Sequence, residues 1–140
     1  MRDILAKRAE ELGLTHRVVF PGLLRGREKW AALHQTVCYC LPSLSEGCSM
    51  SALEAGLAGA PMAVSAACDL GEWFTEGAAV RLPEDPESMA ETLVSLAAWP
   101  QEGVVMGRKA RALVRERYEW RRIARAQIRA YAETLDDQSG

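Results

Sequence analysis

Apolar and polar positions along the N-terminal part of the chain predict a helix, a strand and a second helix. Between residues 3 and 12, apolar side chains recur at helical spacing, and Gly13 follows as a helix stop. Residues 17–20 form a short β-prone run that predicts a strand, closed by Pro21 and Gly22. Residues 28–34 again follow a helical pattern.

The pattern changes in the middle of the chain to a strand, a polar loop, a helix and a second strand. Residues 37–41 and 61–65 are apolar runs typical of strands buried on both faces, and a helix is expected to begin near Ser49. This order within about 30 residues predicts a βαβ unit with parallel strands. A further strand is expected at 78–82, after a loop at 66–75.

The C-terminal part of the pattern is helical. Pro86 opens a helix that runs to Trp99. Residues 104–135 are expected to form the C-terminal helices, with a bend near 118–120, and residues 136–140 read as a frayed tail. The chain is therefore interpreted as a single α/β domain over residues 1–140, with a Rossmann-like, four-stranded parallel sheet and flanking helices.

The loop at 43–49 lies where parallel sheets bind ligands, at the carboxyl end of a strand and the N-terminus of a helix. Gly47 allows the backbone to approach a ligand closely. The N–H groups of Ser49, Met50, Ser51 and Ala52, at the start of the helix, would attract a phosphate.

Two carboxylates, Glu46 and Glu54, bracket this helix start and are separated by seven residues. Carboxylates accept hydrogen bonds from hydroxyl groups, so the pair suggests a sugar or ribose on either side of an anion. A structural interpretation is also open, in which Ser51 and Glu54 form a capping box and Glu46 complements the helix dipole.

Composition limits the possible functions. The chain has 140 residues, of which 49% are hydrophobic and 26% charged, and its net charge is −2. These values are typical of a soluble globular domain and do not favour nucleic acid or an anionic membrane as partner. The cysteines at 38, 40, 48 and 68 lack metal-ligand spacing. They are interpreted as buried thiols of a cytoplasmic protein.

The C-terminal segment is locally basic, with nine Lys and Arg residues between positions 108 and 129. A phosphate-binding patch or an anionic membrane contact is one interpretation. Because Glu102, Glu116, Glu119 and Glu133 are interleaved, a solvated helix face is the favoured interpretation.

The stretch from Ser43 to Pro61 resembles the donor-site signature of retaining, nucleotide-sugar-dependent glycosyltransferases of the GT-B type, glycosyltransferase family 4. It is similar to the pattern Ser-x-x-Glu-Gly-Phe-Gly, three residues, Glu-Ala-x-Ala-x-Gly-x-Pro. The chain departs from that pattern with Cys48-Ser49 in place of Phe-Gly, and with Gly56 where Met is usual. The resemblance covers roughly residues 12–131 and implies the C-terminal, donor-nucleotide-binding domain.

The resemblance also implies roles for individual residues. Glu46 would contact hydroxyls of the donor sugar and act as the catalytic carboxylate, and Glu54 would hold the ribose. The remaining donor contacts would come from backbone and helix-start positions and from two residues near the base: Gly47, Cys48, Ser49, Met50, Ser51, Leu24 and Lys29. In such enzymes the leaving phosphate itself takes the acceptor proton, so no general base, metal or other cofactor is expected.

Parts of the family's donor domain are not found in this sequence. Two further strands, with their Gly-Arg…Lys-Gly and Gly-x-Gly loops, are expected upstream, as is the acceptor-binding domain. In the usual strand order 3-2-1-4-5-6, the chain carries equivalents of strands 3, 4, 5 and 6. We therefore expect a glycosyltransferase piece for polysaccharide or lipid-linked glycan synthesis that is inactive alone, with a missing domain or a second copy as partner. The alternative is a silent module that docks on another chain.

The two missing strands also set the expectation for the sheet. An open gap would leave buried backbone groups unpaired, at a cost of about 1–3 kcal/mol per group. The sequence interpretation favours direct pairing of residues 17–20 with residues 37–41.

Overall fold

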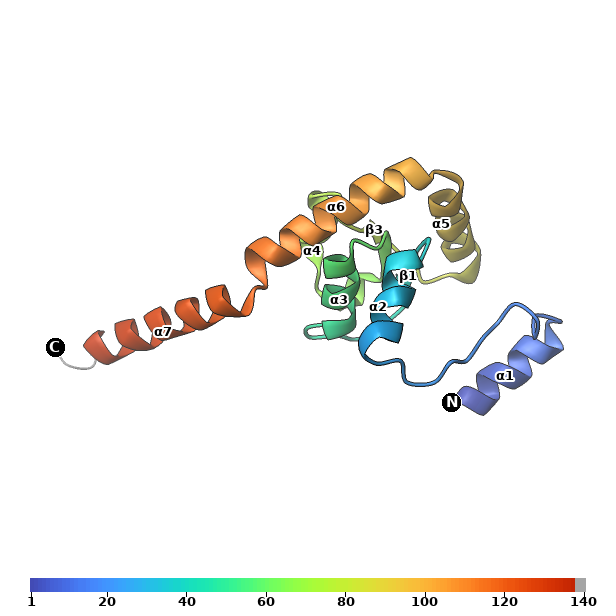
Figure 1. The fold of residues 1–140 in the computed structure, drawn as a ribbon, viewed down its shortest axis with the longest axis horizontal. Coiled ribbons are helices and arrows are strands. Elements are labelled where there is room, and N and C mark those ends of the chain that lie inside the picture. The colour runs from blue at the N-terminus through green and yellow to red at the C-terminus, as the bar shows by residue number, and fades with distance from the viewer. Residues whose placement is uncertain (138–140) are drawn as a thin grey trace.

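The structure is a computed structural model, and it describes residues 1–137. Helices surround a small sheet (Figure 1). In chain order the elements are α1 (Arg2–Glu11), α2 (Gly26–Gln35), β1 (Tyr39–Leu41), α3 (Met50–Ala58), β2 (Met62–Val64), the 3₁₀ turn η1 (Ala66–Cys68), α4 (Gly71–Thr75), β3 (Val80–Arg81), α5 (Pro86–Ala98), α6 (Pro100–Arg117) and α7 (Trp120–Asp137).

The sheet is parallel, has the order β1-β2-β3, and confirms the predicted βαβ unit. Cys40 pairs with Ala63, and Ala63 with Val80. All of β2 is buried, because it is the central strand and carries helices on its faces. The α/β fold class is confirmed, and the carboxyl ends of the strands face one edge, as the site requires.

The predicted strand at residues 17–20 is wrong, and so is its pairing with β1. These residues form an irregular connection between α1 and α2, in which Val19 is 80% exposed. The sheet has three strands, and β1 is hydrogen-bonded only to β2 within the described residues. In the strand order implied by the resemblance, two absent strands separate these segments, so residues 17–20 have no neighbour to pair with.

Other predicted elements are confirmed with small changes. The expected loop at 66–75 contains η1 and α4. The helix opened by Pro86 is α5, and Asp85 caps it by accepting a hydrogen bond from the Ser88 N–H at 2.8 Å. That hydrogen bond lowers the pKa of Asp85. The expected bend near 118–120 separates α6 from α7, and α7 extends to Asp137, while residues 138–140 of the predicted tail lie outside the described residues.

Helix α6 packs against α3 through residues without side chains. A Cβ built on Gly107 would overlap the Gly59 carbonyl oxygen, and one on Gly103 would lie 3.1 Å from Pro61 Cγ. Arg111 of α6 also donates hydrogen bonds to the carbonyl oxygens of Leu57, at 3.0 Å, and Ala58. These carbonyls end α3 and would otherwise lack helical partners, so Arg111 caps α3. Its positive charge also interacts favourably with the negative, C-terminal end of the helix dipole.

The unusual Gly56 is explained by a large neighbour. A Cβ at this position would lie 2.7 Å from Cη2 of Trp73, which is fully buried in the core. The indole of Trp73 therefore fills the space that a side chain at position 56 would take, which makes the two residues mutually dependent.

The two ends of the chain extend away from the body (Figure 1). Helix α1 carries exposed Ile4 and Leu5, Leu12 is exposed just after it, and α7 carries exposed Trp120 and Tyr131. Among the described residues, no helix combines the length and the apolar character needed to cross a membrane. The apolar faces of α1 and α7 thus have no cover in the isolated chain.

Replacement of Gly107 by Ala should lower the free energy of unfolding by about 1–3 kcal/mol, because α6 must move away from the Gly59 carbonyl. Gly71→Ala is the matched control, since a Cβ there meets no atom within 4 Å and its φ is not positive. Urea unfolding followed by circular dichroism measures both. Equal stabilities of the two variants would contradict the close approach of α6 to α3.

Candidate donor-binding site

The loop between β1 and α3 is held to the neighbouring segment by two hydrogen bonds, and a third lies within the loop. The Ser65 hydroxyl, after β2, donates to the Ser43 carbonyl oxygen at 2.6 Å. The Glu46 N–H donates to the Ala67 carbonyl oxygen at 3.0 Å. Ser43 in turn donates through its hydroxyl to Glu46 Oε1 at 3.1 Å. The Glu46 carboxylate is therefore held at the carboxyl edge of the sheet.

Helix α3 begins where the sequence predicts, but its cap differs from the capping-box interpretation. Ser49 is the N-cap, is 3% exposed, and accepts a hydrogen bond from the Ala52 N–H at 3.4 Å. Of the four N–H groups expected to be free for an anion, that of Ala52 is thus already used. Ser51 lies inside the helix and Glu54 points elsewhere, so the proposed Ser51–Glu54 capping box is wrong.

Ser51 belongs to a short chain of hydroxyl groups. The Tyr39 hydroxyl donates to Ser51 Oγ at 2.8 Å, and Ser51 Oγ lies 3.1 Å from Ser49 Oγ. Burial raises the pKa of Tyr39, although its hydrogen bond with Ser51 opposes this shift. The phenol therefore stays protonated near neutral pH and continues to donate to the helix start.

Glu54 forms an ion pair with Lys29, which the sequence had placed near the base. The Lys29 Nζ to Glu54 Oε1 distance is 2.6 Å, and both side chains are about one-third exposed, at 34% and 31%. Lys29 also lies 5.8 Å above the centroid of the Trp30 ring. The pair connects α2 to α3 and leaves the second carboxylate oxygen of Glu54 without a bond to Lys29.

A cavity of about 450–500 Å³ adjoins this ion pair. Its walls come from α2, α3 and the α6–α7 junction, and they are largely apolar: Trp30, Met50, Leu53, Glu54, Leu57, Val114, Arg115, Tyr118, Glu119, Trp120 and Arg121. Glu54 and Met50 thus share one concave surface. Leu24, the predicted apolar contact of the base, is half-buried two residues before α2 and does not line this cavity.

The remaining predicted donor contacts lie on the exposed loop. Gly47 and Cys48 are exposed, so their backbone is accessible, and a Cβ at Gly47 would meet no atom within 4 Å. The tight approach for which Gly47 was singled out is therefore not required by the protein itself. Tyr118, which lines the cavity and whose pKa is raised by burial, donates its hydroxyl hydrogen to Glu72 Oε1 at 2.9 Å.

The prediction of four buried thiols is wrong for most of the cysteines. Cys68 is buried, Cys38 is half-buried, and Cys40 and Cys48 are exposed. Cys40 lies on the open edge of the sheet, where no further strand covers it. Burial still raises the pKa values of Cys38 and Cys40. Within residues 1–137, no three His, Cys, Asp or Glu side chains gather as a metal site would require.

Three residues of the site escaped sequence reasoning: Tyr39, Ser43 and Ser65. Each acts through a hydrogen bond to another part of the loop or helix start. For Ser43 and Ser65 the sequence signal was their position just after β1 and β2, at the ligand edge of the sheet, whereas Tyr39 begins β1 and carried no such signal.

Comparisons with known proteins agree with this geometry. A family profile described as glycosyl transferases group 1 matches residues 1–98. An uncharacterized glycosyltransferase from Methanocaldococcus jannaschii is 31% identical over 140 residues, covering 97% of this chain and 35% of that protein. MMP α-(1→4)-mannosyltransferase from Mycolicibacterium hassiacum is 30% identical over 128 residues, covering 89% of this chain and 31% of that protein.

The fold is also similar to that of a solved structure. Sucrose-phosphate synthase from Thermosynechococcus elongatus has a TM-score of 0.84 and 24% sequence identity, over 97% of this chain and 35% of that chain. The chain thus spans about a third of the length of the relatives it matches. The resemblance to GT-B enzymes noted in the sequence is confirmed.

Replacement of Ser49 by Ala should destabilise the domain by about 1 kcal/mol, because it removes the α3 cap. Ser51→Ala should cost less, since Ser51 is exposed and its hydrogen-bond partners can turn to water. Urea midpoints of the two variants measure the difference. A larger loss for Ser51→Ala would restore the capping-box interpretation.

Proposed function

The chain belongs to the glycosyl transferases group 1 family, and on that premise we propose that residues 43–54 bind the nucleoside diphosphate sugar of a retaining glycosyltransferase. The observation that carries this proposal is the position of Glu46 and Glu54. Both flank the N-terminus of α3 at the carboxyl edge of a parallel sheet. The names of the relatives support a sugar-transfer reaction of the same kind.

In this proposal each part of the donor meets a matching group. Glu46, held by Ser43, accepts hydrogen bonds from the donor sugar, while the backbone of Gly47 and Cys48 lines that sugar. The N–H groups of Met50 and Ser51 have no preceding helical carbonyl, so they and the helix dipole attract the distal phosphate.

Lys29 and Glu54 act together on the nucleoside. Glu54 accepts hydrogen bonds from the ribose hydroxyls through its second oxygen while Lys29 remains on the first. The ammonium group offsets the charge of Glu54, which lowers its repulsion of the donor's diphosphate. We place Lys29 beside the ribose for this reason, and keep Leu24 as the apolar contact nearer the base.

In the proposed transfer reaction, the protein contributes by positioning the donor and by stabilising charge. The leaving phosphate accepts the acceptor's proton, so the protein stabilises the departing diphosphate at the α3 N-terminus and orients the sugar on Glu46. No metal is needed in this scheme.

The isolated chain is incomplete in this proposal. Its accessible surface is 10382 Å². A compact monomer of 15.4 kDa is expected to expose about 7,200 Å². The difference, about 3,000 Å², is comparable to what an extensive domain or subunit interface buries. The relatives are about three times as long as this chain, and a further acceptor-binding part would cover this surface. The same exposed surface favours the second candidate, a silent module that docks on another chain.

Isothermal titration with uridine and guanosine diphosphates should detect weak binding that Glu54→Gln reduces by about 10- to 150-fold, equivalent to losing a charged hydrogen bond of ~1.5–3 kcal/mol. The matched control is Glu91→Gln, the same change at an exposed residue of α5. Glu46→Gln should weaken the sugar conjugates but leave the free diphosphates unaffected. Equal binding by wild type and Glu54→Gln would refute the ribose assignment, and no nucleotide binding at all would favour the docking module.

Purified residues 1–140 should not transfer sugar to any acceptor. Without an acceptor-binding part nothing aligns the acceptor hydroxyl with the donor, and an effective-molarity advantage of roughly 7–11 kcal/mol is lost. A radiolabelled donor assay, with donor hydrolysis measured separately, tests this. Transfer of label to a glycan or lipid acceptor would contradict the expectation, whereas slow hydrolysis agrees with it.

A further inference from the structure

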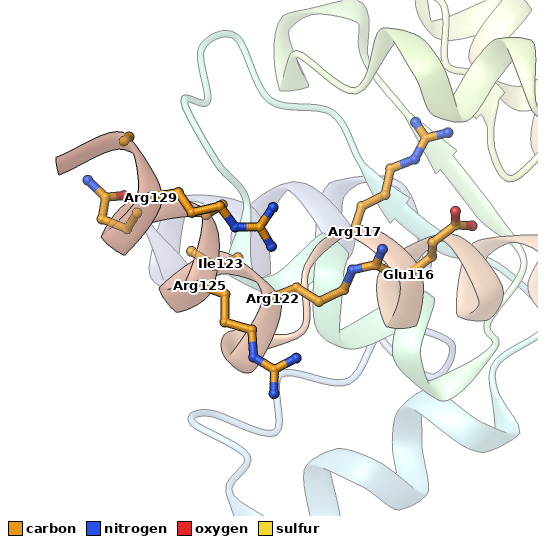
Figure 2. Close-up of a pocket in the computed structure, with 9 residues that line it drawn as sticks. Glu116, Arg117, Arg122, Ile123, Arg125 and Arg129 are labelled. Carbon is orange, nitrogen blue, oxygen red and sulfur yellow. The ribbon is translucent and has the colours of Figure 1, made fainter. Parts of the chain in front are cut away.

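A second concave surface, distant in sequence from the donor loop, is rich in arginine. It lies at the junction of α6 and α7 and has a volume of about 900–950 Å³. Arg117 comes from α6, and Arg122, Arg125 and Arg129 come from α7, with Glu116 as the acidic lining residue. Figure 2 shows Arg122 and Arg129 extending from α7 toward the end of α6.

The arginines of α7 lack acidic partners in the part of the chain that the structure describes. Arg117 is bonded to Glu72 and, at 3.3 Å, to Glu76, so its charge is already offset. Among residues 1–135, whose side chains the structure describes, no ion pair forms at Arg122, Arg125 or Arg129. The sequence interpretation of a solvated helix face agrees with the exposure of α7, although the interleaved glutamates form no ion pairs with these three arginines.

The arrangement of these charges is unfavourable for an isolated helix. Arg122 and Arg125 are three residues apart, and Arg125 and Arg129 four, which are the spacings at which like charges repel on a helix. Arg121 and Arg122 also lie in the first turn of α7, where the helix dipole disfavours cations. A bound anion would offset both the repulsion between the arginines and their unfavourable interaction with the helix dipole. This local destabilisation is typical of a binding site.

Charge is also segregated along the chain. Residues 108–129 contain nine basic and two acidic residues, a net charge of +7, in a chain whose total is −2. The positive potential is thus concentrated on α6 and α7.

The arginine face and the apolar face of α7 are separate. At 100° per residue, Trp120, Ile128 and Tyr131 fall within one quarter of the helix circumference, while Arg122, Arg125 and Arg129 lie on the opposite side. Another domain can therefore cover the apolar stripe and leave the arginines accessible.

We propose that Arg122, Arg125 and Arg129 bind the phosphate groups of an anionic phospholipid surface. Guanidinium groups bind phosphate oxygens in pairs of parallel hydrogen bonds. From Arg122 to Arg129 the helix rises about 10 Å, more than one phosphate or diphosphate spans, so the row fits phosphates presented side by side. A bilayer surface presents them in that way and attracts each arginine over a Debye length.

Vesicle cosedimentation of the whole chain tests this proposal. Phosphatidylcholine vesicles are compared with vesicles of equal parts phosphatidylcholine and phosphatidylglycerol, at low and high salt, with and without added pyrophosphate. The test variant is Arg122→Gln, Arg125→Gln, Arg129→Gln. The control variant, Arg2→Gln, Lys7→Gln, Arg27→Gln, removes the same charge at exposed positions elsewhere. Circular dichroism confirms that both variants keep their helices.

Salt-sensitive binding to phosphatidylglycerol vesicles, weakened about 100-fold in the test variant and retained in the control variant, is the expected result. Equal loss of vesicle binding in both variants would show that binding depends on net charge alone. Equal binding of the chain to pure phosphatidylcholine vesicles would show that the apolar stripe of α7, and not the arginines, makes the contact. Displacement by micromolar pyrophosphate would replace the lipid surface with a discrete phosphate ligand. Each of these outcomes, or no binding at all, overturns the proposal.

Discussion

The close packing of α6 on the C-terminal end of α3 is the constraint on which the site depends. Gly107 brings the α6 backbone against the Gly59 carbonyl, and Arg111 caps the last carbonyls of α3. Any side chain at position 107 would push the two helices apart. Because α3 also covers the sheet, fixing its C-terminal end fixes the direction in which its N-terminal end points, toward the loop that carries Glu46.

Hydrogen bonds of the loop between β1 and α3 fix the N-terminal end of α3. Ser49 closes the first turn of α3, and Ser65 and Ala67 hold the preceding residues from the next strand and turn. These bonds are formed within the βαβ unit itself and need nothing from α1 or α7. The loop and the start of α3 are therefore fixed by contacts within the βαβ unit, in a chain whose two ends are uncovered.

Sequence reasoning succeeded where short-range rules and the sheet agreed. The βαβ unit and the start of α3 follow from apolar runs, a polar loop and a serine N-cap, and all of these interactions lie between neighbours in the chain. It failed at residues 17–20, because strand formation needs a partner strand, and β-prone Val18 and Val19 have none among the described residues.

In the candidate site, too, short-range sequence patterns were less informative than contacts between residues distant in the chain. A capping box at Ser51 and Glu54 was a reasonable local pattern, but a helix takes one N-cap, and the buried Ser49 occupies that position. Glu54 was then free to pair with Lys29, a residue 25 positions away whose proximity no spacing rule predicts. Gly56 likewise acquires its meaning only from Trp73, which the fold places against it.

The ion pair of Lys29 and Glu54 connects α2 to α3 and fixes one oxygen of the Glu54 carboxylate. In the proposed nucleotide site, a lone carboxylate would repel a diphosphate, whereas a carboxylate that keeps a lysine on one oxygen presents a nearly neutral pair. Both side chains remain about one-third exposed, so water screens the attraction and the pair adds little to stability. Its value lies in orientation: α2 holds Lys29, Lys29 holds Glu54, and the free oxygen of Glu54 is presented in one direction. Under the proposed function, a ribose hydroxyl would meet a hydrogen-bond acceptor already in place, and this arrangement involves α2 and α3 alone.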